Sequence, residues 1–401
     1  MSLIIKSNNI YCEDSVISGY LEIENGKFKE IHQSYIPRDE DDIIDYSNHT
    51  IIPGIIDLHS HGYATWAAKT INPKELNGLS NVLPSIGVTS TLATTTAWAT
   101  HEFDNLKVMD KSIEDGCEGT RILGIHMEGP FFNPDYHNAT PRKEVQKPSL
   151  EKMKQYLAIT KHIKYMTIAP DMEGSSEIIA YLDANNIIVG GGHTNATYQQ
   201  MNMGIDSGLK VSIHTGNAMR GIDRREVGSL GASLLDPNLY CEIICDLYHL
   251  SKEMIEIMFR IKNDMSKFLM ISDSDSLAGV EPGDYKFNDQ IIHVHKDGRL
   301  LLDDGTIFGS SKNVLYGIKN LVTQLHMPLE KVVPLFSLNP ATLMNMQDEI
   351  GSIKKGKTAD FVVLNSNFEV QSTYIDGVCK YIHGDKLETN PSFYDSFIKL
   401  K

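Results

Sequence analysis

The feature that most constrains the fold of this chain is an alternation of short apolar runs with amphipathic helical stretches. This order indicates parallel strands joined by crossover helices. There are eight apolar runs: IIPGIIDLHSH, TSTLATTT, RILGIHMEG, KYMTIAPD, NIIVGGGH, KVSIHTG, YCEIICDLYH and KFLMISDSD. Eight parallel strands with intervening helices predict an α/β protein, a (β/α)8 TIM-like barrel. A doubly wound open sheet is the alternative.

The two ends of the chain have a different pattern. Both hold short β-rich runs punctuated by turn residues, and Asn25–Gly26 is a strong hairpin signal. The chain of 401 residues is long enough for a large barrel and a small second unit. We therefore expect residues 1–52 and 357–401 to form an accessory β-domain, a small β-sandwich, and residues 53–356 to form the barrel.

Charge and cysteine usage limit the classes of partner and compartment. A formal net charge of -15 argues against nonspecific binding to nucleic acid or to an anionic membrane. The start of the chain resembles no export signal, and no apolar run has the roughly 20 residues of a membrane span. Five scattered cysteines do not fit a disulfide framework, so we expect a cytoplasmic protein. Cys241 and Cys245 are expected to be buried core thiols.

Several polar residues stand at or near the ends of the predicted strands. Barrel enzymes place their catalytic groups at the C-terminal ends of the strands, so this shared placement indicates a site. A single histidine of this kind would more often be a core or surface residue. The residues are His59, His61, Glu128, His193, His214, His249 and Asp273.

The spacing of His59 and His61 puts both imidazoles on the same side of a strand. Together with a carboxylate and further imidazoles they form a ligand set that suits Zn²⁺, Fe²⁺ or Mn²⁺ better than magnesium or calcium. Such a cation lowers the pKa of a bound water to about 7 and polarises a carbonyl, as amide hydrolysis requires. The sequence thus predicts a divalent metal, with zinc favoured over iron and manganese.

The motifs that carry these residues resemble the N-acetylglucosamine-6-phosphate deacetylases of the amidohydrolase superfamily. The resemblance runs through most of the chain, and it is specific because several motifs occur together. They are PGIIDLHSHG at 53–62, HMEGPFFNP at 126–134, GGHTNAT at 191–197, HTGNAM at 214–219, ISDSDSLAG at 271–279, and NPATLMNM with IGSIKKGKTADFVVL towards the end.

The resemblance implies an assignment of the metal ligands. It implies that Glu128, His193 and His214 hold a principal metal. His59 and His61 resemble the ligands of a second metal, with Glu128 able to bridge the two. We therefore expect one or two metals per subunit.

The resemblance also implies that Asp273 is the catalytic carboxylate. In this role it takes a proton from the attacking water and delivers it to the departing amine. Asp275 is the competing candidate, because strand alternation points it the same way but farther out. The alternative interpretation of this acidic pair is a solvated turn.

Substrate contacts follow from the same resemblance. An Arg and a His suit a phosphate, and they supply positive charge that the acidic chain otherwise lacks. Arg220 and Arg224 are nearby alternatives to Arg225, and the resemblance further implies a homodimer in which a neighbouring subunit contributes phosphate contacts. The segment Ile307, Phe308 and Gly309 matches one that lies against the sugar, and its alternative is an ordinary turn into a helix. The other matching positions are Asn217, Ala218, Arg225 and His249.

Four departures from the family pattern fall in segments that face the substrate. The segment after the HxHG motif is Tyr63, Ala64, Thr65 and Trp66, and Thr140 stands where His or Gln is common, with His137 close by. Val227 replaces a usual Pro, and Leu247 replaces a usual Gly. The reaction type is therefore better defined than the sugar, and N-acetylgalactosamine 6-phosphate is an alternative substrate.

Two further functions compete with a deacetylase. A cyclic-amide hydrolase would usually carry a carboxylated Lys at the end of the fourth strand, but the run KYMTIAPD has none there. A non-catalytic sugar-phosphate sensor or a structural metal protein would need no spare carboxylate such as Asp273. Metal-dependent acetate release distinguishes these functions from the deacetylase.

Overall fold

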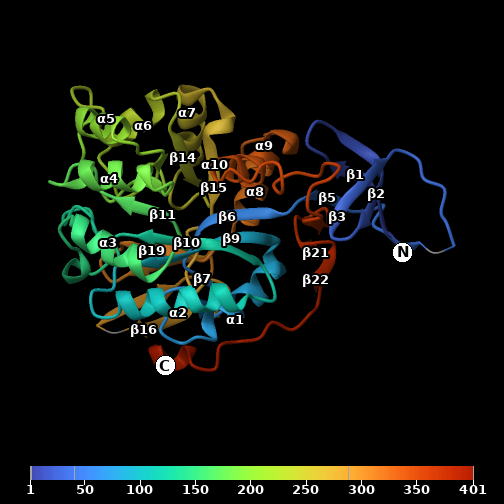
Figure 1. The fold of residues 1–401 in the computed structure, drawn as a ribbon, viewed down its shortest axis with the longest axis horizontal. Coiled ribbons are helices and arrows are strands. Elements are labelled where there is room, and N and C mark those ends of the chain that lie inside the picture. The colour runs from blue at the N-terminus through green and yellow to red at the C-terminus, as the bar shows by residue number, and fades with distance from the viewer. Residues whose placement is uncertain (1, 40, 288, 401) are drawn as a thin grey trace.

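The computed structural model describes residues 2–39, 41–287 and 289–400. All eight predicted strands are present and form one parallel sheet in chain order, with helices outside it (Figure 1). The structure therefore confirms the (β/α)8 barrel. The strands are β6 (Ile55–Ser60), β9 (Val88–Thr96), β10 (Arg121–Glu128), β11 (Ile163–Ile168), β12 (Ile188–Gly191), β13 (Val211–Ser212), β14 (Tyr240–Ile244) and β15 (Phe268–Ile271).

Polar contacts between the first and last strands close the barrel. The amide of Asp273 donates to the carbonyl of His59 at 2.9 Å, and the amide of His61 donates to the carbonyl of Ser274 at 2.8 Å. Below these contacts the Ser272 hydroxyl donates to the buried carboxylate of Asp57 at 2.5 Å. The seam thus fixes the backbone beside the two histidines and Asp273.

Four of the helices around the barrel begin at a residue whose side chain caps the first turn. Ser149, Thr197, Ser251 and Asn313 each accept a backbone N–H in the first turn of the helix that follows. The helices are α1 (Glu75–Val82), α2 (Glu102–Asp115), α3 (Leu150–Ile159), α4 (Ser175–Ala184), α5 (Tyr198–Asp206), α6 (Gly228–Leu235), α7 (Lys252–Lys262), α8 (Val314–Thr323), α9 (Leu329–Phe336), α10 (Leu338–Leu343) and α11 (Phe393–Ser396). Short 3-10 helices lie at Leu83–Ile86, Arg142–Glu144 and Met265–Lys267.

A separate sheet joins the two ends of the chain at one side of the barrel (Figure 1). Its central contact is the antiparallel pair β5 and β20, which links residues from the two ends. The predicted hairpin at Asn25–Gly26 is confirmed, because both residues have positive φ between paired strands. The strands are β1 (Leu3–Tyr11), β2 (Val16–Glu24), β3 (Lys27–His32), β4 (Asp42–Asp45), β5 (Thr50–Pro53), β20 (Phe361–Leu364), β21 (Val370–Ile375) and β22 (Val378–Ile382).

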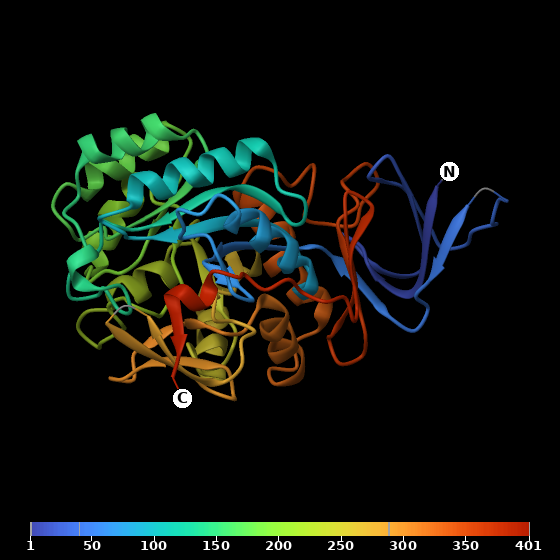
Figure 2. The ribbon, with the colours of Figure 1, turned by 90° about the horizontal axis from the view of Figure 1, so that it is seen from below.

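A further antiparallel sheet follows the last barrel strand, and the sequence pattern did not predict it. Its outer strand is the last one of the chain, so the segment after β22 runs along the barrel to reach it (Figure 2). The expected division into residues 1–52 with 357–401 and residues 53–356 remains a prediction. The last strand, β23, belongs to this further sheet and not to the sheet that joins the two ends of the chain. The strands are β16 (Gly283–Phe287), β17 (Gln290–Val294), β18 (Arg299–Leu302), β19 (Ile307–Ser310) and β23 (Phe397–Lys399). A small hairpin pairs β7 (Gly62–Tyr63) with β8 (Trp66–Ala67).

The cysteines have the environment that the sequence predicted. Cys241 and Cys245 are buried thiols of the core, and all five cysteines are free. Burial raises the pKa of the Cys241 thiol to about 11, which makes it a poor nucleophile. In the described part of the chain, no helix is both long and apolar enough to cross a membrane.

A partly buried ion cluster ties the turn after β1 to the segment before β20. Glu13 accepts the Ser352 hydroxyl at 2.6 Å and lies 2.9 Å from the buried ammonium of Lys357. Burial by itself would raise the pKa of Glu13, but Lys354, Ser352 and Lys357 lower it to about 2. A carboxylate with a depressed pKa stabilises the fold above its unfolded pKa, and this contribution disappears as the pH falls towards 2.

We expect Glu13→Gln to lower the free energy of unfolding at pH 7 by roughly 2 kcal/mol, which is less than the pKa shift alone would give because water screens this partly exposed cluster. The difference from the parent should shrink as the pH falls below about 4.5 and vanish near pH 2. Urea unfolding at a series of pH values measures it. Glu30→Gln is the control, because Glu30 pairs with Lys355 at the surface. A loss that does not change with pH would contradict the expectation.

Candidate metal-binding active site

The candidate metal and acid-base residues lie together at the C-terminal end of the barrel. His59 belongs to β6 and Glu128 is the last residue of β10. His193, His214 and Asp273 each stand two residues beyond the end of their strand. The C-terminal ends of parallel strands share one edge of the barrel, which explains why positions so distant in sequence meet here.

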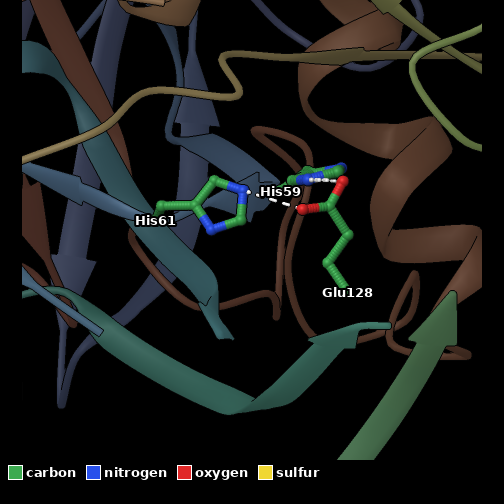
Figure 3. A group of neighbouring side chains, drawn as sticks. All are labelled: His59, His61 and Glu128. Carbon is green, nitrogen blue, oxygen red and sulfur yellow. Dashed lines mark ion pairs between the residues drawn. The ribbon is translucent and has the colours of Figure 1, made fainter. Parts of the chain in front are cut away.

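Glu128 is the centre of this cluster, and the rings of His59 and of His61, which directly follows β6, both face its carboxylate (Figure 3). The Nε2 atom of His59 lies 3.4 Å from Oε1 of Glu128, and Nε2 of His61 lies 3.3 Å from Oε2. One ligand atom from each of the three residues lies within 4.8 Å of the others, a spacing that a single metal ion can span. The geometry therefore forms one potential metal site.

A second group shares the same carboxylate. The Nε2 atoms of His193 and His214 lie 3.3 Å and 3.2 Å from Oε1 of Glu128, and 3.2 Å from each other. The Nδ1 atom of His193 donates to the carbonyl of Tyr136 at 2.8 Å, so its Nε2 atom is free to act as a ligand. Glu128 is thus placed to bridge two ions.

Asp273 and Asp275 have different surroundings. Oδ1 of Asp273 lies 3.4 Å from Nε2 of His59 and 3.2 Å from Nε2 of His61, at the edge of the cluster. Asp275 instead accepts the amide of Leu277 at 3.0 Å and the hydroxyl of Ser276 at 3.1 Å, and so stabilises the following turn. Of the two carboxylates, the cluster thus contains only that of Asp273.

Three of these residues have unusual backbone conformations. The φ angles of His193, His214 and Asp273 are +48°, +27° and +50°, in the left-handed region that non-glycine residues rarely adopt. Such conformations cost about 1–3 kcal/mol each and concentrate at functional sites. The surrounding fold therefore holds these side chains in place at the expense of local backbone energy.

The electrostatics of the cluster favour a bound cation. Burial alone would lower the pKa of His59, but the carboxylates around it, Glu242 foremost, raise it well above its usual range. Burial alone would likewise raise the pKa of Glu128, but His59 and its other imidazole neighbours hold it well below the usual range. Despite burial, Asp273 and Glu128 raise the pKa of His61 to about 9. A divalent ion can replace the protons that these groups share.

Glu242 is a buried neighbour of the cluster that the sequence analysis missed. It is fully buried in the middle of β14, and its carboxylate lies 2.9 Å from Nδ1 of His59. The signal was available, because an acidic residue interrupts the otherwise apolar run YCEII. His126 also packs beside His59, but burial lowers its pKa well below the usual value, so it is a neutral neighbour.

Three of the expected substrate residues lie in loops next to the cluster. Asn217 and Ala218 belong to the turn after His214, and the amide of Asn217 donates to the carbonyl of His214 at 2.9 Å. His249 follows β14, and its Nδ1 atom lies 2.8 Å from Asp246. Although burial opposes protonation, Asp246 raises the pKa of His249, and this favours a cationic imidazole suited to an anion.

The segment Ile307–Gly309 is part of strand β19 and not a turn into a helix. A Cβ atom at Gly309 would lie 3.3 Å from the carbonyl oxygen of Asp273, so the backbone passes close to the proposed acid-base residue. The next residue, Ser310, donates from its hydroxyl to Asp246 at 3.2 Å. The strand is thus connected to both Asp273 and the His249 loop.

The loop after β10 lies against His193. The amide of Asn133 donates to the carbonyl of His193 at 2.9 Å, and farther along the loop His137 donates through Nδ1 to the carbonyl of Thr140 at 2.6 Å. His137 therefore supports the backbone at Thr140. A substrate contact by the side chain of Thr140 or His137 stays a prediction.

Arg225 is not among the residues that the fold brings to the cluster. It lies in the exposed segment before α6, and its amide donates to the side chain of Asp223 at 3.0 Å. Arg224 is exposed beside it, whereas Arg220 donates through Nε to the side chain of Asn195 at 2.8 Å. The phosphate contact expected of Arg225 therefore stays a prediction.

The barrel, the shared Glu128 and the imidazole groups define a metal-dependent hydrolase. The chain belongs to the amidohydrolase family, whose profile matches residues 50–379. The end of β11 carries no lysine, since Lys164 lies near its start. The lysine expected at this position of a cyclic-amide hydrolase is therefore absent from the end of β11.

Within this family the chain is similar to deacetylases of amino-sugar phosphates. It is 31% identical over 356 residues to N-acetylglucosamine-6-phosphate deacetylase of Vibrio furnissii, covering 88% of both chains. It is 29% identical over 329 residues to N-acetylgalactosamine-6-phosphate deacetylase of Escherichia coli O157:H7, covering 82% of this chain and 86% of that one. The structure of N-acetylglucosamine-6-phosphate deacetylase from Thermotoga maritima superimposes with a TM-score of 0.82 at 27% identity, over 94% and 99% of the two chains. These similarities confirm the resemblance that the motifs indicated.

Proposed function

We propose that this protein hydrolyses the N-acetyl group of an N-acetylhexosamine phosphate. The favoured substrate is N-acetylglucosamine 6-phosphate, which would yield glucosamine 6-phosphate and acetate. The observation that carries the proposal is the position of the Asp273 carboxylate beside His59 and His61, two of the four histidines that surround Glu128. Metal ligands and a separate carboxylate are the components that metal-assisted amide hydrolysis requires.

The cluster fits a divalent metal, and we propose zinc, with iron or manganese as alternatives. Glu128, His193 and His214 would hold the principal ion, and His59 and His61 would hold a second one together with Glu128. The fit is supported by Nε2 of His59, which is buried, points at the cluster and makes no hydrogen bond. When bound, such an ion acidifies a water molecule and polarises the amide carbonyl.

Asp273 is the proposed general base and general acid. Its carboxylate is held close to Nε2 of His61, where it can take the proton of the attacking water and pass it to the departing amine. Burial opposes ionisation, but the neighbouring His59 and His61 outweigh it and lower the pKa of Asp273, so its carboxylate is ionised in this cluster. The strand seam with His59 keeps it at this position.

The phosphate is proposed to bind to His249 from one subunit and to Arg225 from the other subunit of a homodimer. Arg225 is exposed in the segment before α6, and this exposure supports a contact across an interface. Tyr198 and Ile222, which lie near this segment, keep 40% and 51% of their surface exposed. Exposed apolar side chains around an unpaired arginine are typical of a surface that a partner covers.

We expect Arg225→Ala to cost the 6-phosphorylated substrate roughly 2–4 kcal/mol of transition-state stabilisation, measured as a fall in kcat/KM, because it leaves the phosphate without a charge-assisted partner. The weak activity on the unphosphorylated sugar should barely change, so the two substrates should converge. Arg224→Ala is the matched control, since it removes an adjacent exposed arginine. Equal losses on both substrates would assign Arg225 a structural role and remove the phosphate contact.

The sugar can be identified by acetate release from a small substrate panel. N-acetylgalactosamine 6-phosphate is the second candidate, because one similar protein is a deacetylase of that sugar. The panel holds both sugars with and without 6-phosphate, together with dihydroorotate and a hydantoin, and it is run with protein of known metal content. Binding without acetate release would indicate a sensor, whereas hydrolysis of dihydroorotate or a hydantoin in its place would indicate a cyclic-amide hydrolase.

The five free thiols support a reducing compartment, and we propose the cytoplasm.

A further inference from the structure

The buried carboxylate of Glu242 has no role in the proposed proton transfer, yet it lies inside the barrel with none of its surface exposed. An ionised carboxylate in such a place is costly unless hydrogen bonds compensate for the lost water. Glu242 has three partners from three different parts of the barrel. They are Nδ1 of His59 at 2.9 Å, the hydroxyl of Tyr165 at 2.8 Å and the amide of His214 at 3.1 Å.

The contact with His59 decides which ring nitrogen carries the proton. A carboxylate only accepts hydrogen bonds, so Nδ1 of His59 must be the donor. The lone pair of a neutral ring then lies on Nε2, which points at the cluster. There Nε2 is 3.4 Å from Glu128 and 3.4 Å from Asp273, and it makes no hydrogen bond of its own.

The orientation of the ring is fixed as well. Packing alone would leave two ring orientations open, because the ring of His126 contacts His59 edge-on, with 4.6 Å between centroids. Only one of them puts Nδ1 at Glu242 and Nε2 at the cluster. Outer carboxylates that hold a ligand histidine in this way raise its basicity, and their loss typically costs 10–100-fold in metal affinity.

We propose that Glu242 is a positioning residue that makes His59 a ligand, and that the site formed by His59, His61 and Glu128 binds its own metal ion for this reason. This inference rests on the proposed metal centre. Glu242 would act through His59 and would not itself be a ligand. The site formed by Glu128, His193 and His214 should depend on it much less, because Glu242 contacts neither imidazole ring of that site and accepts only the backbone amide of His214.

The test measures the affinity for each of two equivalents of Zn²⁺, by titrating metal-free protein against a chromophoric chelator. Glu242→Gln is the informative variant, because its amide oxygen can still accept from His59 and His214 while the charge is lost. We expect the weaker equivalent to lose ~10–100-fold in affinity and the tighter one to stay within a few-fold of the parent. Tyr165→Phe is the matched control, since it removes one partner of Glu242 but leaves the carboxylate beside His59.

Two further measurements separate positioning from a purely structural role. Thermal unfolding of the metal-free proteins should show Glu242→Gln folded like the parent. In a His59→Asn background the same substitution should change the affinity for the weaker equivalent little, because the ring through which Glu242 acts is gone.

The possible failures point to different conclusions. Unchanged affinity in Glu242→Gln, an equal loss at both equivalents, or a parent protein that binds only one equivalent would each overturn the role of Glu242 and leave the deacetylase intact. A parent protein that binds no metal and hydrolyses the substrate fully would instead overturn the proposed function.

Discussion

Asp273→Asn should lower kcat by at least ~10²-fold while both metal positions keep their affinity. This is the usual contribution of a positioned proton-transfer group. Asparagine keeps the shape of the side chain but cannot accept the proton of the attacking water. Oδ1 of Asp273 lies 3.2 Å from Nε2 of His61, so the variant also tests whether the carboxylate acts in catalysis or only in holding that ring. Steady-state kinetics and metal analysis of the same preparation are the two measurements.

Asp275→Asn is the matched control. Asp275 stands two residues away and is occupied by the amide of Leu277 and the hydroxyl of Ser276, so its substitution should be far milder. Losses of the same size in the two variants would show that the wrong carboxylate has been assigned, or that the two act together. Loss of metal in Asp273→Asn would instead indicate that Asp273 is a ligand.

Glu128→Ala should abolish activity and leave the protein with little bound metal, because Glu128 is the one carboxylate that both imidazole groups share. His193→Ala should have nearly the same effect, since it removes a ligand of the principal position. Metal content measured by mass spectrometry, together with acetate release, tests both variants. Full activity of thoroughly metal-free parent protein would contradict the whole assignment.

His59→Ala provides the comparison within the cluster. If His59 serves only the second position, the variant should keep one metal and part of its activity. The Glu242→Gln variant should then resemble it in metal content, because Glu242 acts through the same ring. A His59→Ala protein that lost all metal would show that the two positions fill together.

The barrel and the placement of its site could be predicted because both depend on local patterns. Each strand is a short apolar run, and the C-terminal ends of parallel strands always share one edge. Residues as distant as His59 and Asp273 could therefore be expected to meet without any knowledge of the folded chain. The family motifs added the roles of the ligands to this arrangement.

Other features depend on contacts that no local pattern records. The sheet formed by β16 to β19 is completed by β23 from the far end of the chain, and only the folded molecule decides that pairing. Strand alternation alone would point Asp273 and Asp275 the same way. In the folded chain, the carboxylate of Asp275 accepts the amide of Leu277 in the following turn. The position of Arg225 outside the cluster also follows from the course of a loop.

The sequence by itself determined the alternation of strands and helices, the edge of the barrel that carries the chemistry, and the identity of the residues at that edge. Only the tertiary structure decided that Glu242 holds His59. The two residues lie on different strands and meet across the interior of the barrel, so their contact depends on how the closed sheet brings its inward-facing side chains together. A buried charge can be recognised in a sequence, but its partner becomes visible only once the barrel has closed.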